Sequence, residues 1–278
     1  MDPIKRIAFV INDTKSGASD LGASLQALAI DQGVEIVRAS GFPVDRGFLD
    51  GVDACCVIGG DGTFLSVAVE AARQQVPLVG VNRGTLGFLT TFAGDEAEEL
   101  FPRVLNGEYR LNHRSMLDCQ VHEGHSDFAL NDVVVKAKEN ATILHVKVYA
   151  DDEFITTYVC DGLIFSTPTG STAYTLSAGG PLVHPMAEVI SLTPICPHTL
   201  SNRSIILPHN VNLRVENADK NEPLLVAIDG QRNLTTSGGP IRIKQAERKL
   251  PIAQKLDYSH FNVVRKKLKW NGGYKGEF

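Results

Sequence analysis

Residues 54–74, ACCVIGGDGTFLSVAVEAARQ, decide the fold of the first part of the chain. The continuous apolar run at 54–58 predicts a buried strand, because a strand covered on both faces has no solvated side. Apolar residues at helical spacing predict a helix from 63 to 74. A glycine-rich loop connects the two, and strand, loop and helix in this order are typical of one unit of an α/β sheet.

The same alternation continues on both sides of this stretch. Apolar runs and helical periodicity predict strands at 5–12, 34–37 and 78–81, and helices at 19–32 and 95–105. Strands that alternate strictly with helices indicate a parallel sheet with helices on both faces. We therefore predict an N-terminal, doubly wound α/β domain.

The sequence pattern changes after about residue 108. Short runs rich in valine, isoleucine, tyrosine and threonine, separated by turn residues, occur at 116–122, 132–136, 143–149, 154–158 and 212–215. Such runs predict an antiparallel β-sandwich. We expect an α/β domain at 1–108 and a β-sandwich domain at 109–254, followed by a short helix within 258–270.

Composition and charge narrow the classes of function. The 278 residues carry a net charge of −5, which gives no basic field for a nucleic-acid backbone, so we expect no nucleic-acid partner. No apolar run approaches the roughly 20 residues of a membrane span, and the N-terminus shows no signal-peptide core. The five cysteines form no C-x-x-C pair. We expect a cytoplasmic protein with no membrane partner.

The loop Gly59-Gly60-Asp61-Gly62-Thr63 carries the first chemical signal. It lies at the carboxyl end of a predicted strand, where ligands bind in open α/β sheets. Its glycines let the backbone approach a ligand, and the amides at the start of the next helix form an anion site. The Asp61 carboxylate suits accepting a proton from a hydroxyl or holding a divalent cation beside a phosphate.

Two familiar nucleotide motifs are excluded at this loop. The dehydrogenase pattern G-x-G-x-x-G fails because Leu65 stands in place of the last glycine. A Walker A loop needs Gly-Lys-Ser or Gly-Lys-Thr, and neither tripeptide occurs in the chain.

A second loop, at 82–90, follows the next predicted strand and offers the amide of Asn82 and the guanidinium of Arg83. Because parallel strands end at one edge of a sheet, we expect it beside the first loop. Arg83 suits neutralising a phosphate, although a lone loop arginine is as often an exposed surface residue.

The densest polar stretch is DGLIFSTPTGSTAYTLSAGGP at 161–181. Its hydroxyls and amides suit the base and ribose of a nucleotide. Asn131-Asp132 begins a predicted strand and pairs an amide with a carboxylate, which suits adenine or two ribose hydroxyls. Alone, each piece is more often a surface loop or turn than a binding site. Together with the Gly-Asp-Gly loop they indicate a nucleotide site.

These motifs together resemble those of the NAD kinases. The matching elements are the loops at 59–63 and 82–90, Asn131-Asp132, 161–181 and the turn IDGQ at 228–231. The resemblance implies transfer of the γ-phosphoryl group of ATP, or of polyphosphate in some members, to the 2′-hydroxyl of the adenosine ribose of NAD. It also implies an α/β domain followed by a β-sandwich, a divalent cation (Mg²⁺ or Mn²⁺) arriving with ATP, and a homodimer or homotetramer. The C-terminal segment 255–278 would pack back on the first domain.

The resemblance implies roles for individual residues. Asp61 is the expected catalytic residue, either as general base or as an orienting or metal-binding carboxylate, and no dedicated protein ligands for a metal are expected. The expected phosphate-binding residues are Gly59, Gly60, Gly62, Thr63, Asn82 and Arg83. The residues expected to bind NAD are Asp61, Gly62, Asn131, Asp132, Asp161, Thr172, Ala173, Tyr174, Thr175, Leu176, Ser177 and Gln231.

The chain departs from the family pattern at two places. Many bacterial relatives carry Asn-Glu where this chain has Asn131-Asp132, so the acidic side chain here is one methylene shorter. Some relatives place a basic residue where Val159 stands, and an ionic contact with substrate from that position is absent here.

The sequence also allows two alternative functions and contains one weak metal-like motif. The Gly-Gly-Asp-Gly-Thr motif also allows a lipid kinase of the diacylglycerol or sphingosine type, and the fold allows a non-catalytic nucleotide sensor. His122-Glu-Gly-His125 has the spacing H-E-x-H rather than the zinc spacing H-E-x-x-H, and we expect a hairpin turn there.

Overall fold

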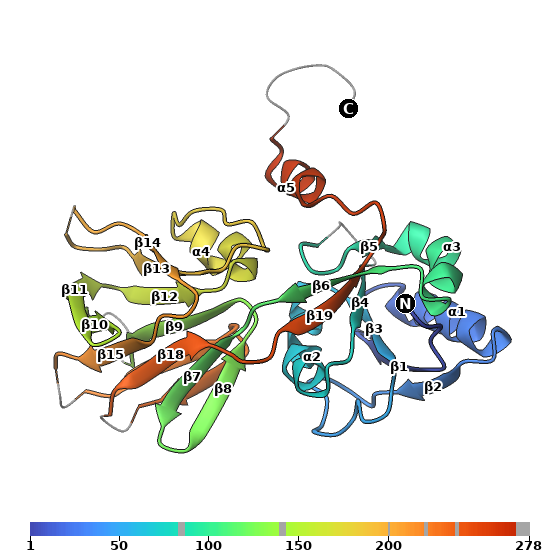
Figure 1. The fold of residues 1–278 in the computed structure, drawn as a ribbon, viewed down its shortest axis with the longest axis horizontal. Helices are drawn as coiled ribbons and strands as arrows, with labels where there is room; N and C mark the ends of the chain where they lie inside the picture. The colour runs from blue at the N-terminus through green and yellow to red at the C-terminus, as the bar shows by residue number, and fades with distance from the viewer. Residues whose placement is uncertain (83–86, 139–142, 200, 220–221, 237–238, 271–278) are drawn as a thin grey trace. The chain divides into compact units, whose positions relative to one another are not determined.

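The computed structural model describes residues 1–82, 87–138, 143–199, 201–219, 222–236 and 239–270. The chain divides into two compact units (Figure 1). Unit 1 comprises residues 1–113 and the chain from 250 onward, and unit 2 comprises 114–249. The sequence-based boundaries were 108 and 255. The difference arises because β6 (Arg110–Arg114) and β19 (Leu250–Gln254) both belong to the sheet of unit 1.

Unit 1 contains a seven-stranded sheet in the order β2-β1-β3-β4-β19-β6, with β5 also paired to β4. The pairs β1–β2, β1–β3, β3–β4, β4–β5 and β4–β19 are parallel, which confirms the predicted parallel sheet. Its further elements are β1 (Arg6–Ile11), α1 (Ala18–Asp31), β2 (Glu35–Arg38), β3 (Ala54–Gly59), α2 (Asp61–Gln74), β4 (Leu78–Asn82), β5 (Phe92–Ala93), α3 (Gly94–Leu105) and α5 (His260–Leu268).

Helices cover both faces of this sheet. On one face Phe9 of β1 packs in a cluster with Leu25 of α1 and Phe101 of α3, and the rings of Phe9 and Phe101 lie 6.0 Å apart. On the other face a Cβ added to Gly80 of β4 would stand 3.0 Å from Phe64 of α2. Burial on both faces explains the continuous apolar runs of β1 and β3. The helix α2 begins at Asp61, two residues after the last residue of β3.

Unit 2 is built from two antiparallel six-stranded sheets, ordered β11-β10-β15-β18-β7-β8 and β14-β13-β12-β9-β16-β17. The strands are β7 (Leu117–His122), β8 (His125–Ala129), β9 (Asp132–Ala137), β10 (Leu144–Ala150), β11 (Glu153–Cys160), β12 (Gly162–Ser166), β13 (Val189–Ile195), β14 (Ile205–Pro208), β15 (Leu213–Asn217), β16 (Leu224–Ile228), β17 (Arg232–Thr235) and β18 (Ile241–Gln245). The expected hairpin at 122–125 joins β7 to β8.

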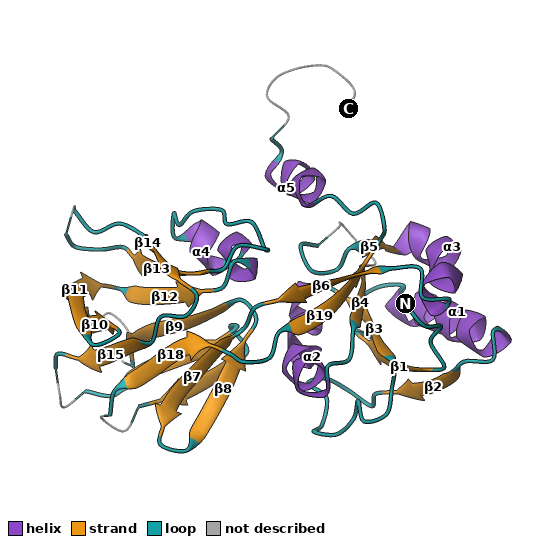
Figure 2. Ribbon diagram, viewed as in Figure 1, coloured by secondary structure: helices purple, strands orange, loops and turns teal. Residues whose placement is uncertain are grey.

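Helical structure is sparse in unit 2 (Figure 2). A 3₁₀ turn, η1 (Thr169–Thr172), is followed by one short helix, α4 (Tyr174–Ser177). Within the described residues of the whole chain, no helix combines the length and hydropathy that crossing a membrane requires.

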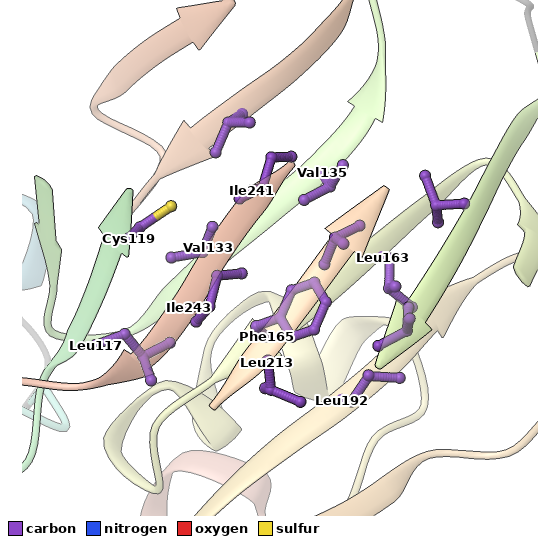
Figure 3. Packing of buried hydrophobic residues seen from close by; sticks show 14 of the residues in the cluster. Leu117, Cys119, Val133, Val135, Leu163, Phe165, Leu192, Leu213, Ile241 and Ile243 are labelled. Carbon is purple, nitrogen blue, oxygen red and sulfur yellow. The ribbon is translucent and has the colours of Figure 1, made fainter. Parts of the chain in front are cut away.

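The two sheets of unit 2 pack face to face. Leu117 and Cys119 of β7 share one buried cluster with Val133 and Val135 of β9, which belongs to the other sheet (Figure 3). In each pair the members lie two residues apart, because successive side chains of a strand point to opposite faces. The predicted β-sandwich is therefore confirmed, and its core is formed by the inward faces of both sheets.

We expect the substitution Phe165→Ala to destabilise unit 2 by about 3–5 kcal/mol, since the ring on β12 is fully buried and its loss leaves a cavity. Urea unfolding followed by circular dichroism measures the change. Phe154→Ala, at an aromatic side chain that is 52% exposed on β11, is the matched control and should cost far less. Equal losses in the two variants would contradict the packing described here.

Candidate functional site

The phosphate loop of unit 1 lies between β3 and α2, as expected from the sequence. Gly60 is the N-cap of α2 with an extended backbone, and Asp61 is the first helical residue. The first amides of a helix have no partner within it, so they are available to an anion. Gly59 must stay a glycine because a Cβ there would stand 2.6 Å from the Thr63 hydroxyl. Backbone amides and the positive helix end therefore face the loop together.

The Asp61 carboxylate holds the second loop of the sheet. Its Oδ2 accepts a hydrogen bond from the amide of Phe88 at 3.1 Å. Its Oδ1 accepts from the amides of Leu89 and Thr90 at 3.3 and 3.2 Å and from the Thr90 hydroxyl at 3.1 Å. These bonds fix the carboxylate relative to both loops, so it cannot rotate freely about its own side-chain bonds.

Neighbouring residues leave little freedom around this carboxylate. A Cβ added to Gly87 would collide with Asp61 Oδ1 and with the Thr90 hydroxyl, so only glycine fits there. Asn82 is buried at the end of β4 and donates to the Thr90 hydroxyl at 3.1 Å. Asn82 thus holds the second loop through its hydrogen bond to Thr90. Arg83, the expected phosphate ligand beside it, lies outside the described residues.

The loop between β1 and α1 is a third part of this edge, which sequence reasoning missed. The Asn12 side chain donates to the Thr63 hydroxyl at 2.9 Å, and its backbone amide donates to the Ile58 carbonyl at 2.9 Å. The Lys15 ammonium lies against Gly60, since a Cβ added there would stand 2.5 Å from its Nζ. The available signal was the position of Asn12 directly after a predicted buried strand.

In unit 2, Asp229 holds the Asn131-Asp132 segment. Asp229 lies in the turn between β16 and β17 with a positive φ of 51°. Its carboxylate accepts hydrogen bonds from the amides of Leu130, Asn131 and Asp132 at 2.9, 2.7 and 3.1 Å. Its own amide donates to the Asp132 carbonyl at 2.9 Å. Sequence reasoning matched the IDGQ turn but selected Gln231, and the long-range contact that singles out Asp229 has no local signal.

The polar stretch after β12 packs on the same segment. The Asn131 carbonyl accepts from the Thr167 amide at 2.9 Å and from the Ser166 hydroxyl at 3.2 Å. A Cβ added to Gly170 would collide with this carbonyl, so η1 approaches Asn131 as only glycine allows. The backbone of Tyr174 hydrogen-bonds the Asp132 carboxylate. The expected residues Asn131, Asp132 and 172–177 are therefore brought together.

The side chains of α4 differ in accessibility. Thr175 is buried, whereas the expected site residues Thr172, Ala173, Tyr174, Leu176 and Ser177 are at least partly exposed. Lys136 of β9 lies beside the Tyr174 ring, with its Nζ 5.3 Å from the ring centre and 3.4 Å from the phenol oxygen. This lysine was not predicted as a site residue.

The expected residues Asp161 and Gln231 differ in their position relative to the Asn131-Asp132 backbone. Asp161 is exposed and precedes β12, whereas Asp132 pairs with Ser166 at the other end of that strand. The described neighbour of the Asp161 carboxylate is His198, whose Nε2 lies 3.8 Å away. Gln231 is exposed in the turn after β16, two residues beyond Asp229. The structure thus places Asp161 one strand length from Asp132.

Two buried acids lie close together at this site. Burial, and then the neighbouring Asp229 carboxylate, raises the pKa of Asp132 to about 7. Burial also raises the pKa of Asp229, but the three backbone amides and Arg232 oppose this change. Asp229 therefore keeps its charge more readily, and Asp132 is the acid that retains a proton near neutrality.

The described residues contain no group of three or more His, Cys, Asp or Glu side chains placed to hold a metal ion. The Asp61 carboxylate at the phosphate loop is used by the amides at 88–90. A divalent cation bound through substrate phosphates needs only one or two protein carboxylates and keeps several waters.

The raised pKa of Asp132 beside Asp229 predicts that the stability of the folded protein depends on pH. Because its folded-state pKa of about 7 exceeds the unfolded value of 3.8, its stabilising contribution is complete below pH 3.8 and is lost as pH rises through 7. Asp132→Asn stays neutral and can still accept from Tyr174. We expect the variant to gain about 1–3 kcal/mol relative to wild type between pH 5 and pH 8.

Thermal unfolding of both proteins at several pH values measures this difference. Asp257→Asn replaces an exposed acid and is the matched control. A difference between Asp132→Asn and wild type that does not grow with pH beyond that of the control would overturn the assignment of the proton to Asp132.

Comparisons with known proteins agree with this geometry. The family model of the ATP-NAD kinase N-terminal domain matches residues 43–109, and that of the C-terminal domain matches 130–254. The NAD kinase of Geotalea daltonii is 41% identical over 223 residues, which is 78% of each chain. The NAD kinase of Pseudomonas putida is 40% identical over 224 residues, 78% of this chain and 76% of the relative.

Solved structures share the fold. Yeast NADH kinase complexed with NADH has a TM-score of 0.86 at 24% identity, covering 100% of this chain and 91% of the yeast chain. An NAD kinase from Archaeoglobus fulgidus in complex with ATP has a TM-score of 0.79 at 24% identity, covering 95% and 98%. The family models and the NAD kinase sequences that this chain resembles do not support the lipid-kinase and sensor alternatives. The matches to both family models and to these NAD kinase sequences show that the chain belongs to the NAD kinase family.

Proposed function

We propose that this protein transfers the terminal phosphoryl group of ATP to the 2′-hydroxyl of the adenosine ribose of NAD, forming NADP and ADP. The observation that carries the proposal is the Asp61 carboxylate, fixed at the first position of α2 beside the phosphate loop. Membership in the NAD kinase family supports the choice of substrates.

Asp61 accepts the proton of the attacking hydroxyl in this reaction. The ribose 2′-oxygen forms a bond to the γ-phosphorus while the bond from that phosphorus to the β,γ-bridging oxygen breaks. ADP leaves, and the hydroxyl proton passes to Asp61. Of the four hydrogen bonds from residues 88–90, three end on Oδ1 and one on Oδ2. We assign the proton to Oδ2, because this oxygen accepts fewer of these hydrogen bonds than Oδ1 does.

The remaining residues of unit 1 bind the donor. The loose transition state of phosphoryl transfer needs positioning and charge neutralisation more than a strong base. Backbone amides at the start of α2 and the glycines before it suit that task. In our proposal the donor phosphates are bound by Gly59, Gly60, Gly62, Thr63, Asn82 and Arg83.

Unit 2 recognises the acceptor in our proposal. Asn131 and Asp132 contact adenine and ribose, the accessible residues of 172–177 line the adenine pocket, and Asp161 contacts the nicotinamide end. Gln231 contacts the nucleotide near Asp229. Asp61 and Gly62 of the phosphate loop are also NAD-binding residues in our proposal. The contacts of this segment support the proposal. Asp229 accepts hydrogen bonds from the amides of Asn131 and Asp132, and the backbone of Tyr174 in α4 hydrogen-bonds the Asp132 carboxylate.

We also propose the setting of the reaction. Mg²⁺ or Mn²⁺ enters as part of the ATP complex, in agreement with the family resemblance. The protein works as a homodimer or homotetramer. Light scattering on the purified protein measures its molar mass and so its oligomeric state. Cys55, Cys56, Cys119 and Cys160 are buried and unpaired, which favours a cytoplasmic location.

We expect Asp61→Asn to lower the turnover number about 100- to 10,000-fold, because an amide cannot take the hydroxyl proton and presents N–H groups to the amide donors at 88–90. The assay uses NAD, ATP and Mg²⁺ and detects NADP with an NADP-specific dehydrogenase. Folded wild-type protein that forms no NADP, with either ATP or polyphosphate, would overturn the proposed function. Near-wild-type turnover of Asp61→Asn would overturn the role of Asp61 alone.

Gly87→Ala tests the position of the carboxylate without changing its chemistry. The added methyl collides with Asp61 Oδ1 and the Thr90 hydroxyl, so the carboxylate must move. A displacement of about 1 Å can cost about 100-fold in rate, and we expect a loss of that order in the same assay. Gly41→Ala is the matched control, since a Cβ there meets nothing within 4 Å. Equal activity of the two variants would contradict this geometry.

A further inference from the structure

Lys15 lies at the phosphate loop although no sequence motif marks it. Its ammonium contacts Gly60, because a Cβ on that glycine would stand 2.5 Å from Nζ and 3.5 Å from Cε. The last part of the lysine side chain therefore lies along the N-cap residue of α2. Gly60 leaves room for it, and any larger residue there would push the ammonium away.

The backbone that carries Lys15 is fixed to the loop it contacts. The Lys15 amide donates to the Asn12 carbonyl at 3.0 Å, and the Asn12 side chain donates to the Thr63 hydroxyl at 2.9 Å. The Asn12 Oδ1 accepts from the amide and hydroxyl of Thr14 at 3.2 and 2.6 Å. Asn12 therefore joins the base of the Lys15 turn to the first turn of α2.

The electrostatics of this placement point to an anion. The N-terminus of α2 carries a positive partial charge, and an ammonium beside it is repelled. Across the described residues, no carboxylate forms an ion pair with Lys15. Asp61 accepts the amides at 88–90, and Asp13 lies near Arg38 and Ser19. A cation held at the positive end of a helix is stabilised when an anion binds between them.

We propose that Lys15 binds the phosphate oxygens of the phosphoryl donor. This inference rests on the proposed function and adds a residue to it. The Lys15 ammonium neutralises charge on the donor phosphates while the amides of α2 hold them, and it forms no covalent bond. A lysine that acts as a point charge on a flexible stem suits phosphate oxygens whose charge shifts during transfer.

The kinetic test compares three variants. Lys15→Met removes the charge and keeps the length, Lys15→Arg keeps the charge, and Lys5→Met removes a charge from an exposed lysine just before β1. Lys15 is exposed, so none of these changes disturbs the core. We expect Lys15→Met to lower kcat/KM for ATP about ten- to hundred-fold, with the KM for NAD within about twofold of wild type. Lys15→Arg should recover most of the loss, and Lys5→Met should match wild type.

The results separate the possible outcomes. A rise in the KM for NAD instead of that for ATP would assign Lys15 to the pyrophosphate of the acceptor and overturn the proposal. Unchanged kinetics of Lys15→Met would overturn it as well.

A binding measurement tests Lys15 even when no NADP is formed. Inorganic tripolyphosphate should raise the melting temperature of wild type and of Lys5→Met, because a ligand that binds only the folded state stabilises it. The shift should be lost in Lys15→Met. An equal shift in all three proteins would overturn the proposal, and this result does not depend on whether the enzyme phosphorylates NAD.

Discussion

The hydrogen bonds between one buried or partly buried carboxylate and the backbone amides of a distant segment organise the candidate site in each unit. In unit 1, Asp61 accepts the amides of residues 88–90, and in unit 2, Asp229 accepts those of residues 130–132. Each carboxylate replaces lost hydration by several charge-assisted hydrogen bonds, which are stronger than neutral ones. Asp61 fixes residues 88–90, which lie outside regular secondary structure, and Asp229 fixes the connection between β8 and the first residue of β9.

The two carboxylates differ in what they are free to do. Asp229 is enclosed by amides and lies close to Arg232, so it suits a supporting role. Asp61 is partly exposed at a helix N-terminus, where anions are favoured. Its anchoring bonds let it act as a fixed acceptor, since the side chain arrives at the reaction already oriented. A loose phosphoryl-transfer transition state benefits more from such positioning than from added basicity.

Much of the fold was predictable, because the pattern of apolar residues within each element indicates which of its faces are buried. The continuous apolar runs of β1, β3 and β4 reflect burial on both faces of the sheet. The alternating pattern of the strands in unit 2 reflects burial on one face. β6 was not predictable, because RLNHR has no apolar run and pairs at the edge of the sheet. The Gly-Asp-Gly loop and Asn131-Asp132 were found from local motifs, whereas Asp229 and Lys15 act on segments far away in sequence or across a turn. Such contacts leave no local periodicity.

The glycines of the site show why its motifs are recognisable at all. Gly59, Gly87 and Gly170 each lie where a Cβ would strike a hydroxyl, a carboxylate or a carbonyl that the site needs. The constraint at each position is steric and local, so it is visible in the sequence even when the partner is remote. The partner side chains are constrained only by distance and charge, and several residue types satisfy such a constraint at a given position. A motif therefore marks where the backbone must come close, and the structure is needed to find which side chain uses the space.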